Sequence, residues 1–386
     1  MSDSLPINSD ILVWARKELN LSIDDVARRM KKTPDIIKAW EAGSSSPTYV
    51  QLEKLAYEIY KIPLAVFFFS EPPNTTRTRS SFRTTPDVLF NMIPAAVIKV
   101  FREAEVMIEN LYELSNGSDS PNQKSILKEL QGNDYVNTAI ALRKHLNVSI
   151  TEQKSWRDSD LALNIWREKI TESGLYIFRN PFKDAEYSGF CLYDERFPII
   201  YLNSSTSKNR QIFTIFHEIW HLLSHTSGID YLHDNRIINY LDKGSSDIET
   251  QCNRFAAEFL IPTQEFERNG LTFKVSEDTI SSLAVEFSVS REVVLRRFLD
   301  YNKVSQSDYE RLTIKWNEEM LSQKKSDTGG SYFNNEMSYL GDKYLRIAFD
   351  AYYKNHISSA QLADYLNIKE KSLPDYEAKY LGRAMA

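Results

Sequence analysis

The sequence lacks most of what a membrane, secreted or disulfide-bonded protein needs. None of its 386 residues lies in an apolar run close to the roughly 18 that a bilayer crossing requires. The opening residues, MSDSLPINSD, show no basic and then apolar secretory pattern. Only two cysteines, Cys191 and Cys252, are present, so a disulfide framework is excluded and we interpret both as core residues. We therefore expect a cytoplasmic protein without membrane contact.

An excess of positive charge is also missing. The chain has 47 Lys and Arg against 53 Asp and Glu, a net charge of −6. A mildly acidic chain is not a bulk nucleic-acid binder, so any DNA contact must be local. What is present is a globular composition, with 42% hydrophobic and 26% charged residues, in a chain too long for one ordinary domain.

Periodicity and turn signals predict a multidomain, mainly α-helical chain with four regions. Residues 1–69 form short helices with tight turns, and residues 70–134 combine a polar linker with a helical segment. Residues 135–303 form an α+β domain, in which the short β-rich segments LYIFRN, YSGFCLYD and FPIIYLN follow helices and lead into a further helix. Residues 304–386 form a helical C-terminal region.

A pattern of helix, turn and helix recurs at low similarity in residues 24–41, 281–298 and 360–377. The first copy is the strongest candidate for a helix-turn-helix unit. The second fits an ordinary helical hairpin equally well, and the third fits one better.

The most informative segment is the apolar helix IFTIFHEIWHLL, which carries His217, Glu218 and His221. The two histidines are four residues apart, so they project from one helix face and can converge on one ion. Neutral imidazole suits zinc, and Glu218 is placed to take a proton from a metal-bound water. The H-E-x-x-H pattern is short, but buried polar groups need partners and a metal satisfies two imidazoles at once. The alternative is a pair of core histidines bonded to carbonyl groups.

A third ligand is expected from the helix SDIETQCNRFAAEFLIP. Positions i+3, i+4, i+7, i+8 and i+11 from Glu249 are mostly small or apolar, so Glu249 points into the core. A lone buried carboxylate is costly unless it is neutralised, which favours Glu249 as the third ligand. Glu258 is half a turn out of phase and should face away. The alternative is a buried Glu249 paired with an arginine or lysine.

These two segments, FTIFHEIWHLL and ETQCNRFAAEFLIP, resemble the ImmA/IrrE metallopeptidases over about residues 135–300. The resemblance implies a gluzincin fold and a zinc metallopeptidase domain at 135–303. It implies that His217, His221 and Glu249 hold the metal and that Glu218 is the general base. Zinc is the expected cofactor, with another divalent metal such as Mn2+ as the alternative. The strand FPIIYLN is expected to align the substrate backbone, and Trp220 departs from the small residue of many members.

Several further side chains are auxiliary candidates. His225 continues the histidine stripe, and we favour a role in closing the helix end over a fourth ligand or a transition-state donor. His233 and Tyr240 follow in the next loop. One of them, or Tyr201, could stabilise the tetrahedral oxyanion, and the sequence does not choose among them.

Residues 12–62 resemble the XRE-type helix-turn-helix of the Cro/repressor class, through LNLSIDDVARRMKKTPDIIKAWEAGSSSPTYVQLEKLA. The resemblance implies that the second helix reads the major groove with its first residues. Ile23 departs from the glutamine of many members, and a protein-docking or dimerising domain is the alternative. The first residues of the second helix are here Thr33, Asp35, Ile36 and Lys38. The segment also holds a local basic patch suited to phosphates: Arg28, Arg29, Lys31, Lys32 and Lys38. The candidate DNA-binding residues are therefore Arg28, Arg29, Lys31, Lys32, Thr33 and Lys38.

Together these features predict a DNA-binding regulator with zinc-dependent endopeptidase activity. The expected partners are operator or promoter DNA and a repressor or toxin protein encoded nearby, with a homodimer as an open alternative. The family resemblance implies cleavage of a repressor-type protein, which would release genes of a stress, mobile-element or toxin–antitoxin locus. The rival hypothesis is an antitoxin or repressor whose peptidase fold binds a partner without cutting it.

Overall fold

The computed structural model describes residues 7–60, 62, 64–73, 93–115, 126–130, 134–184, 186–226, 228–231, 243–269, 274–323 and 332–384. The described chain is mainly helical with one four-stranded sheet, which confirms the predicted fold class. It divides into two compact units, Met1–Glu103 and Ala104–Ala386, which are described separately. Among the described residues, no helix has both the length and the apolar character that crossing a bilayer requires.

Short helices with strong caps make up the first unit. Ser22 and Thr48 form capping boxes at the starts of α2 and α4, which satisfies backbone N–H groups that have no partner within the helix. Arg16 of α1 forms a two-pronged ion pair with Glu41 of α3, with distances of 2.7 and 2.8 Å, and so ties the ends of the bundle together. The elements are α1 (Ser9–Glu18), α2 (Ile23–Met30), α3 (Pro34–Glu41), α4 (Tyr49–Glu53), η1 (Lys54–Tyr60) and η2 (Leu64–Phe68).

The second unit is built around a sheet with strand order β1-β3-β2-β4. Strand β3 (Ile199–Asn203) runs parallel to β1 (Tyr176–Asn180) and antiparallel to β2 (Tyr187–Leu192). The prediction that β3 aligns a substrate backbone is therefore wrong, because neighbouring strands already occupy both of its hydrogen-bonding edges. The fourth strand, β4 (Ile229–Tyr231), pairs with β2 only and was missed from the sequence. It is too short to show an alternating pattern.

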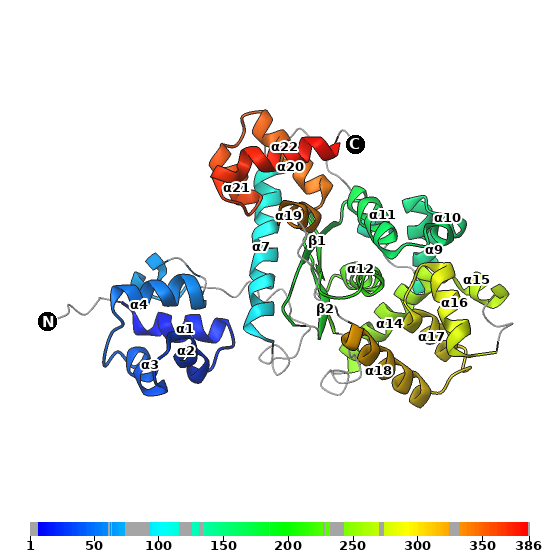
Figure 1. Ribbon diagram of the computed structural model, residues 1–386, viewed down its shortest axis with the longest axis horizontal. Helices are drawn as coiled ribbons and strands as arrows, with labels where there is room; N and C mark the ends of the chain where they lie inside the picture. The colour runs from blue at the N-terminus through cyan, green and yellow to red at the C-terminus, as the bar shows by residue number, and fades with distance from the viewer. Residues whose placement is uncertain are drawn as a thin grey trace. The chain divides into compact units, whose positions relative to one another are not determined.

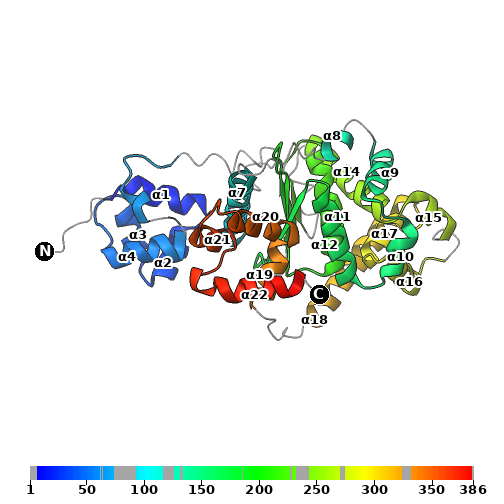
Figure 2. The same cartoon turned by 90° about the horizontal axis from the view of Figure 1, so that it is seen from above.

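One face of this sheet is covered by α12 (Lys208–Leu223), which α11 (Ser159–Glu172) and α14 (Lys243–Leu260) flank (Figures 1 and 2). Gly189 of β2 allows a close approach, because a Cβ atom there would lie 2.6 Å from Thr214 of α12. Cys191, Ile200 and Leu202 point to this face and join one large apolar core. The other helices of this side are α8 (Ile126–Leu130), α9 (Tyr135–Leu146), α10 (Ile150–Trp156), α15 (Thr263–Asn269), α16 (Glu277–Phe287), α17 (Arg291–Asp300) and α18 (Gln306–Gln323).

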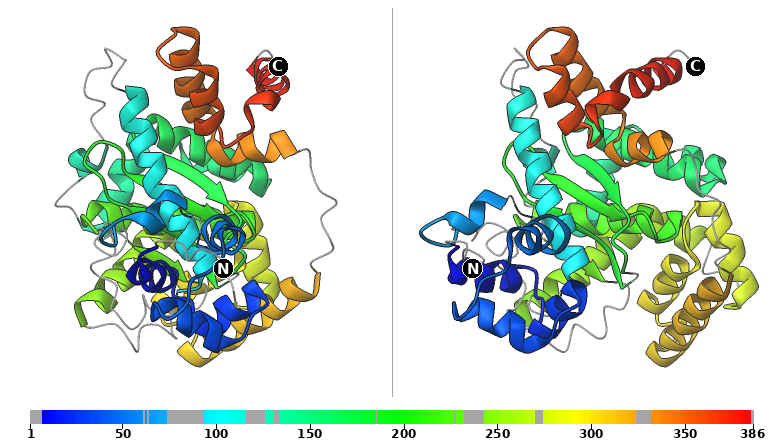
Figure 3. Two further views of the ribbon diagram at one scale, coloured as in Figure 1. Left: turned by 90° about the vertical axis from the view of Figure 1, so that its left-hand side faces the viewer. Right: turned by 60° about the vertical axis from the view of Figure 1, so that its left-hand side comes forward.

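The opposite face of the sheet carries aromatic side chains. The ring of Phe178 in β1 meets Tyr344 of α20 edge-on, with centroids 5.5 Å apart. Asn110, in the part of α7 (Ala95–Ser115) that belongs to this unit, donates to the Tyr344 hydroxyl over 3.3 Å. The C-terminal helices, orange to red in Figure 3, therefore belong to the same unit as the sheet: α19 (Tyr332–Leu340), α20 (Asp342–Tyr353), α21 (Ser359–Tyr365), η3 (Glu370–Ser372) and α22 (Leu373–Ala384).

The three recurring segments share one turn geometry. Lys31, Ser288 and Asn367 each adopt a left-handed φ of 54–55°, and the next element begins three residues later. Lys31 and Ser288 directly follow a helix, whereas Leu366 stands between the end of α21 and Asn367. Their surroundings differ, however. In the second copy the Arg291 guanidinium lies 4.6 Å from the centre of the Trp316 ring in α18, so α17 is packed inside the unit and the copy is a structural hairpin.

Candidate metal centre and DNA interface

Packing between α12 and α14 brings the candidate ligands together. The rings of Phe216 and Phe259 stack with centroids 4.0 Å apart, and Trp220 lies 5.1 Å from Phe255. His217 and His221 are separated by one turn on α12, as Glu249 and Asn253 are on α14. Where the two helices cross, the two histidines of α12 therefore face Glu249 and Asn253 of α14, and apolar side chains surround these four residues.

Both histidines have their Nδ1 atoms engaged. His217 Nδ1 lies 3.2 Å from the amide oxygen of Asn253, and His221 Nδ1 lies 3.2 Å from the hydroxyl oxygen of Thr226. The Asn253 oxygen can only accept, and Thr226 already donates to the His221 carbonyl over 3.0 Å. Each Nδ1 therefore carries a hydrogen, so that either imidazole, in the neutral form that binds a metal, presents the lone pair of Nε2. The sequence pattern assigned no role to Asn253 or Thr226, although Asn253 lies four residues after Glu249 on the same face.

The two Nε2 atoms face Glu249. Its carboxylate oxygens lie 3.2 Å from Nε2 of His217 and 3.3 Å from Nε2 of His221. Neither contact has hydrogen-bond geometry, so both Nε2 atoms are buried without a hydrogen-bond partner in the described part of the chain. Two imidazole nitrogens and a carboxylate form a donor set suited to zinc, and a bound cation would satisfy all three. The residues present therefore fit a metal.

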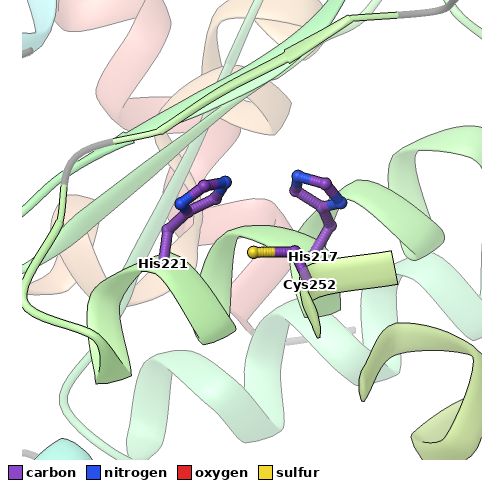
Figure 4. Close-up of side chains that lie close together, drawn as sticks. All are labelled: His217, His221 and Cys252. Atoms are coloured by element: carbon purple, nitrogen blue, oxygen red, sulfur yellow. The ribbon is translucent and has the colours of Figure 1, made fainter. Parts of the chain in front are cut away.

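Cys252 is a second neighbour of the histidines. Its sulfur and one nitrogen from each of His217 and His221 lie within 4.8 Å of one another. In Figure 4 the sulfur points into the space between the two rings. Burial raises the pKa of this thiol well above its usual value, an effect that Glu249 and Glu218 reinforce. The chain thus offers two candidates for the third ligand, and only the carboxylate is charged at neutral pH without a metal.

The centre is rich in negative charge. Burial by itself would lower the pKa of His217, but the carboxylates of Asp230 and Glu249 raise it to about 10. Burial would likewise raise the pKa of Glu249, but the imidazoles of His221 and His217 hold it well below its usual range. The negative charge of Asp230 and Glu249 is therefore compensated only when the centre also holds positive charge. A divalent cation or a proton on His217 supplies that charge.

Glu218 is completely buried beside the histidines. Among the residues that the structure describes, none forms a hydrogen bond of ordinary geometry with either carboxylate oxygen, although the Cys191 thiol lies next to them. Burial is the main reason that the pKa of Glu218 rises to about 7, while His221 and His217 oppose the rise. A buried carboxyl group without fixed partners, poised near neutral pH, has the properties of a general base.

A buried ion pair holds β4 beside this centre. Arg210 donates to Asp230 over 2.7 Å, and the hydroxyl of Thr214 donates to the other Asp230 oxygen over 2.6 Å. Gly228, just before β4, touches His221 so closely that a Cβ atom there would lie 2.3 Å from the imidazole. The outer edge of β4 therefore runs next to a candidate metal ligand.

The comparisons with known proteins agree with this arrangement. Residues 170–299 match the family described as the IrrE N-terminal-like domain, and residues 12–58 match a helix-turn-helix family. The chain carries an ImmA/IrrE-type peptidase domain behind an XRE-type helix-turn-helix domain. The resemblance seen in the sequence is thereby confirmed. No curated protein matches the chain.

Within the ImmA/IrrE-type domain, the auxiliary candidates have different positions. Tyr201 stacks on Phe190 with ring centroids 5.4 Å apart, on the face of the sheet opposite α12, so it cannot act at the centre and that prediction is wrong. His225 is exposed, and its backbone N–H donates to the Leu222 carbonyl group at the end of α12. Its ring contacts the ring of Tyr193 rather than those of the other histidines. His233 and Tyr240 lie outside the described residues.

Glu258 lies on the same helix as Glu249 but has another environment. It is buried and forms an ion pair of 3.0 Å with Arg297 of α17. It also accepts hydrogen bonds from the backbone N–H and the hydroxyl of Thr263, over 2.9 and 2.7 Å. These contacts join α14 to its neighbours and leave Glu258 no part in the centre.

In the DNA-binding helix-turn-helix, α2 and α3 carry the basic patch at their junction. Trp40 and Ile37 are buried and anchor α3, whose N-terminal end follows the left-handed turn at Lys31. Among the polar side chains, Arg28 forms an exposed ion pair of 3.2 Å with Asp25. All six candidate DNA-binding residues are exposed: Arg28, Arg29, Lys31, Lys32, Thr33 and Lys38.

Proposed function

We propose that this DNA-binding regulator is a zinc-dependent endopeptidase that cuts a repressor-type protein and so releases the genes that the repressor controls. The observation that carries the proposal is Glu218, a buried carboxyl group beside His217 and His221 whose oxygens accept no hydrogen bond of ordinary geometry from the described residues. A structural role would have given those oxygens hydrogen-bond partners.

The residues that would hold zinc are His217, His221 and Glu249. When bound, the metal would lower the pKa of a water molecule and polarise the scissile carbonyl group. Asn253 and Thr226 orient the two imidazoles, since each engages an Nδ1 atom and leaves Nε2 directed at Glu249.

Glu218 accepts the proton of the attacking water and passes it to the leaving amine. Its pKa of about 7 suits both transfers at neutral pH. The edge of β4 offers a place for the substrate backbone, because β4 pairs on one side with β2 and no described strand pairs with its other side. An extended peptide added there would lie next to His221.

Replacing Glu218 by glutamine tests this function. Glutamine has nearly the same size and leaves the proposed ligands in place, so the protein should keep its fold and its metal. The chemical step should slow by roughly a hundredfold or more. The assay incubates purified protein with repressor and toxin proteins encoded nearby and follows cleavage by mass spectrometry, with the exposed Glu152→Gln as a control of equal charge change.

The rival function, binding without cutting, gives a different result. In that case the wild-type protein produces no cleavage product, and Glu218→Gln represses and neutralises a toxin as well as wild type does. That pair of outcomes would remove the peptidase proposal while leaving the DNA-binding role intact.

A further inference from the structure

Two buried arginines lie near the C-terminal helices. Arg167 of α11 and Arg179 of β1 are each only 8% exposed. Arg167 donates to the carbonyl groups of Ser338 and Ile177 over 2.9 and 3.1 Å, and Arg179 donates to the Ser338 hydroxyl over 2.9 Å. Within the described parts of the chain, no carboxylate forms an ion pair with either guanidinium, and both Nε atoms lack a hydrogen-bond partner. Buried charge of this kind is costly unless something neutralises it.

Arg167 lines a cavity of about 260 Å3 whose lining residues come from α11, β1, α19 and α20, the elements labelled in Figure 1. Lys343 extends over the ring of Tyr176, 5.0 Å from its centre, and donates to the Thr171 carbonyl over 2.7 Å. Burial lowers the pKa of Lys343 to about 8 and also lowers that of Arg167, while the carboxylates of Glu172 and Asp342 respectively oppose these shifts. Arg346 adds a third cationic side chain, while the acidic lining residues Glu168, Glu172 and Asp342 are exposed at the rim.

The N-terminus of α20 opens into the same cavity. Its N-cap residue is Gly341, which has a φ of +82° and supplies no side chain to cap the helix. A Cβ atom at this position would lie 3.3 Å from the Arg167 guanidinium, so the helix end and the buried cation are neighbours. The 12-residue helix adds partial positive charge at this point, and helix N-termini favour oxyanions.

We propose that this cavity binds a small metabolite through an oxyanion group, a carboxylate or a phosphate, held by Arg167, Lys343 and the N-terminus of α20. Its volume lies just below the ~300–1,000 Å3 of pockets for drug-sized ligands, so a small molecule fits it and a peptide segment does not. A ligand there would contact α11, β1 and α20 at once, and would stabilise the attachment of the C-terminal helices to the sheet. The site is separate from the proposed metal centre and does not depend on peptidase activity.

Binding of two probes to the full-length protein tests the proposal. Inorganic phosphate and succinate are titrated separately at constant ionic strength, by calorimetry and by thermal unfolding. We expect saturable binding and a raised melting temperature with at least one probe, and the probe that binds identifies the ligand as a phosphate or a carboxylate. The absence of saturable binding with both would overturn the proposal.

Two lysine variants locate the binding. Lys343→Gln should weaken binding at least tenfold, because it removes a cation from the cavity wall without replacing the more deeply buried Arg167. Lys354→Gln is the matched control, since this exposed lysine follows the same helix but does not line the cavity. Unchanged affinity in Lys343→Gln would place the anion elsewhere, at the basic patch of the helix-turn-helix or at the metal centre, and would equally reject the proposal.

Discussion

His217 Nδ1 and Asn253 Oδ1 lie 3.2 Å apart in the buried contact between α12 and α14. This contact sets the direction of the imidazole ring before any metal arrives. Because a fixed ring does not have to be ordered when the ion binds, the contact should strengthen metal binding.

We expect Asn253→Ala to weaken zinc binding by roughly ten- to a hundredfold, the range found when a hydrogen-bond partner of a ligating histidine is removed. Competition with a zinc chelator measures the affinity. Asn253→Asp should retain more of it, since a carboxylate also accepts from Nδ1. Gln251→Ala, on the exposed side of the same helix, should bind zinc as wild type does. Equal affinities in all four proteins would show that the contact does not orient the ring.

The identity of the third ligand can be decided between two neighbours on α14. We expect Glu249→Ala to lose its metal on dialysis, because two protein ligands hold zinc far more weakly than three. Cys252→Ala should keep it, because burial raises the pKa of the thiol and makes the ligating thiolate costly. Metal content by mass spectrometry separates the two, and the reverse result would assign the third position to sulfur.

Glu258 provides a control for that experiment. Glu258→Ala should keep the metal but lose ~3 kcal/mol of stability, since Arg297 would remain buried without its partner. Urea unfolding measures this loss. An empty centre in a folded Glu258→Ala protein would contradict the assignment of Glu249.

The basic patch of the helix-turn-helix should contact phosphates rather than bases. Replacing both Arg29 and Lys32 by glutamine should weaken binding to promoter DNA at all sequences. It should also reduce the slope of log affinity against log salt by roughly one per lost contact. Lys17→Gln, exposed on α1, should leave the slope unchanged. A slope unaltered by the double substitution would indicate that the patch binds a protein.

Binding of an anion in the cavity should weaken with rising pH. Lys343 is protonated below its pKa of about 8 and neutral above it, so an anion gains its attraction at pH 7 and loses it by pH 9. Burial also lowers the pKa of Arg167, but a guanidinium group keeps its charge over this pH range. Burial raises the pKa of Tyr176 to about 12, so its phenol stays neutral. The cavity also contains the exposed side chains of Arg346, Glu168, Glu172 and Asp342.

Sulfate is the suitable probe, because its charge is constant over this range. We expect its affinity to fall about tenfold between pH 7 and pH 9, the loss of one charge-assisted hydrogen bond. The Lys343→Gln protein should show a much flatter profile. A wild-type profile as flat as that of the variant would remove Lys343 from the binding site.

Much of the local structure follows from the sequence. The spacing of His217 and His221 places them on one helix face whatever surrounds that helix, and three of the four strands coincide with β-rich segments. Such predictions succeed because helix and strand periods fix which neighbours within one element share a face.

Contacts between distant segments had to come from the tertiary structure. Three features depend on how separate elements pack. These are the pairing of β3 on both edges, the position of Tyr201 on the far face of the sheet, and the partners of the two histidine Nδ1 atoms. The cavity around Arg167 also depends on such packing, since its lining comes from three segments spread over residues 164–346. The sequence by itself determined that His217, Glu218 and His221 share one helix. Only packing, which brings together residues far apart in the chain, decided what surrounds them.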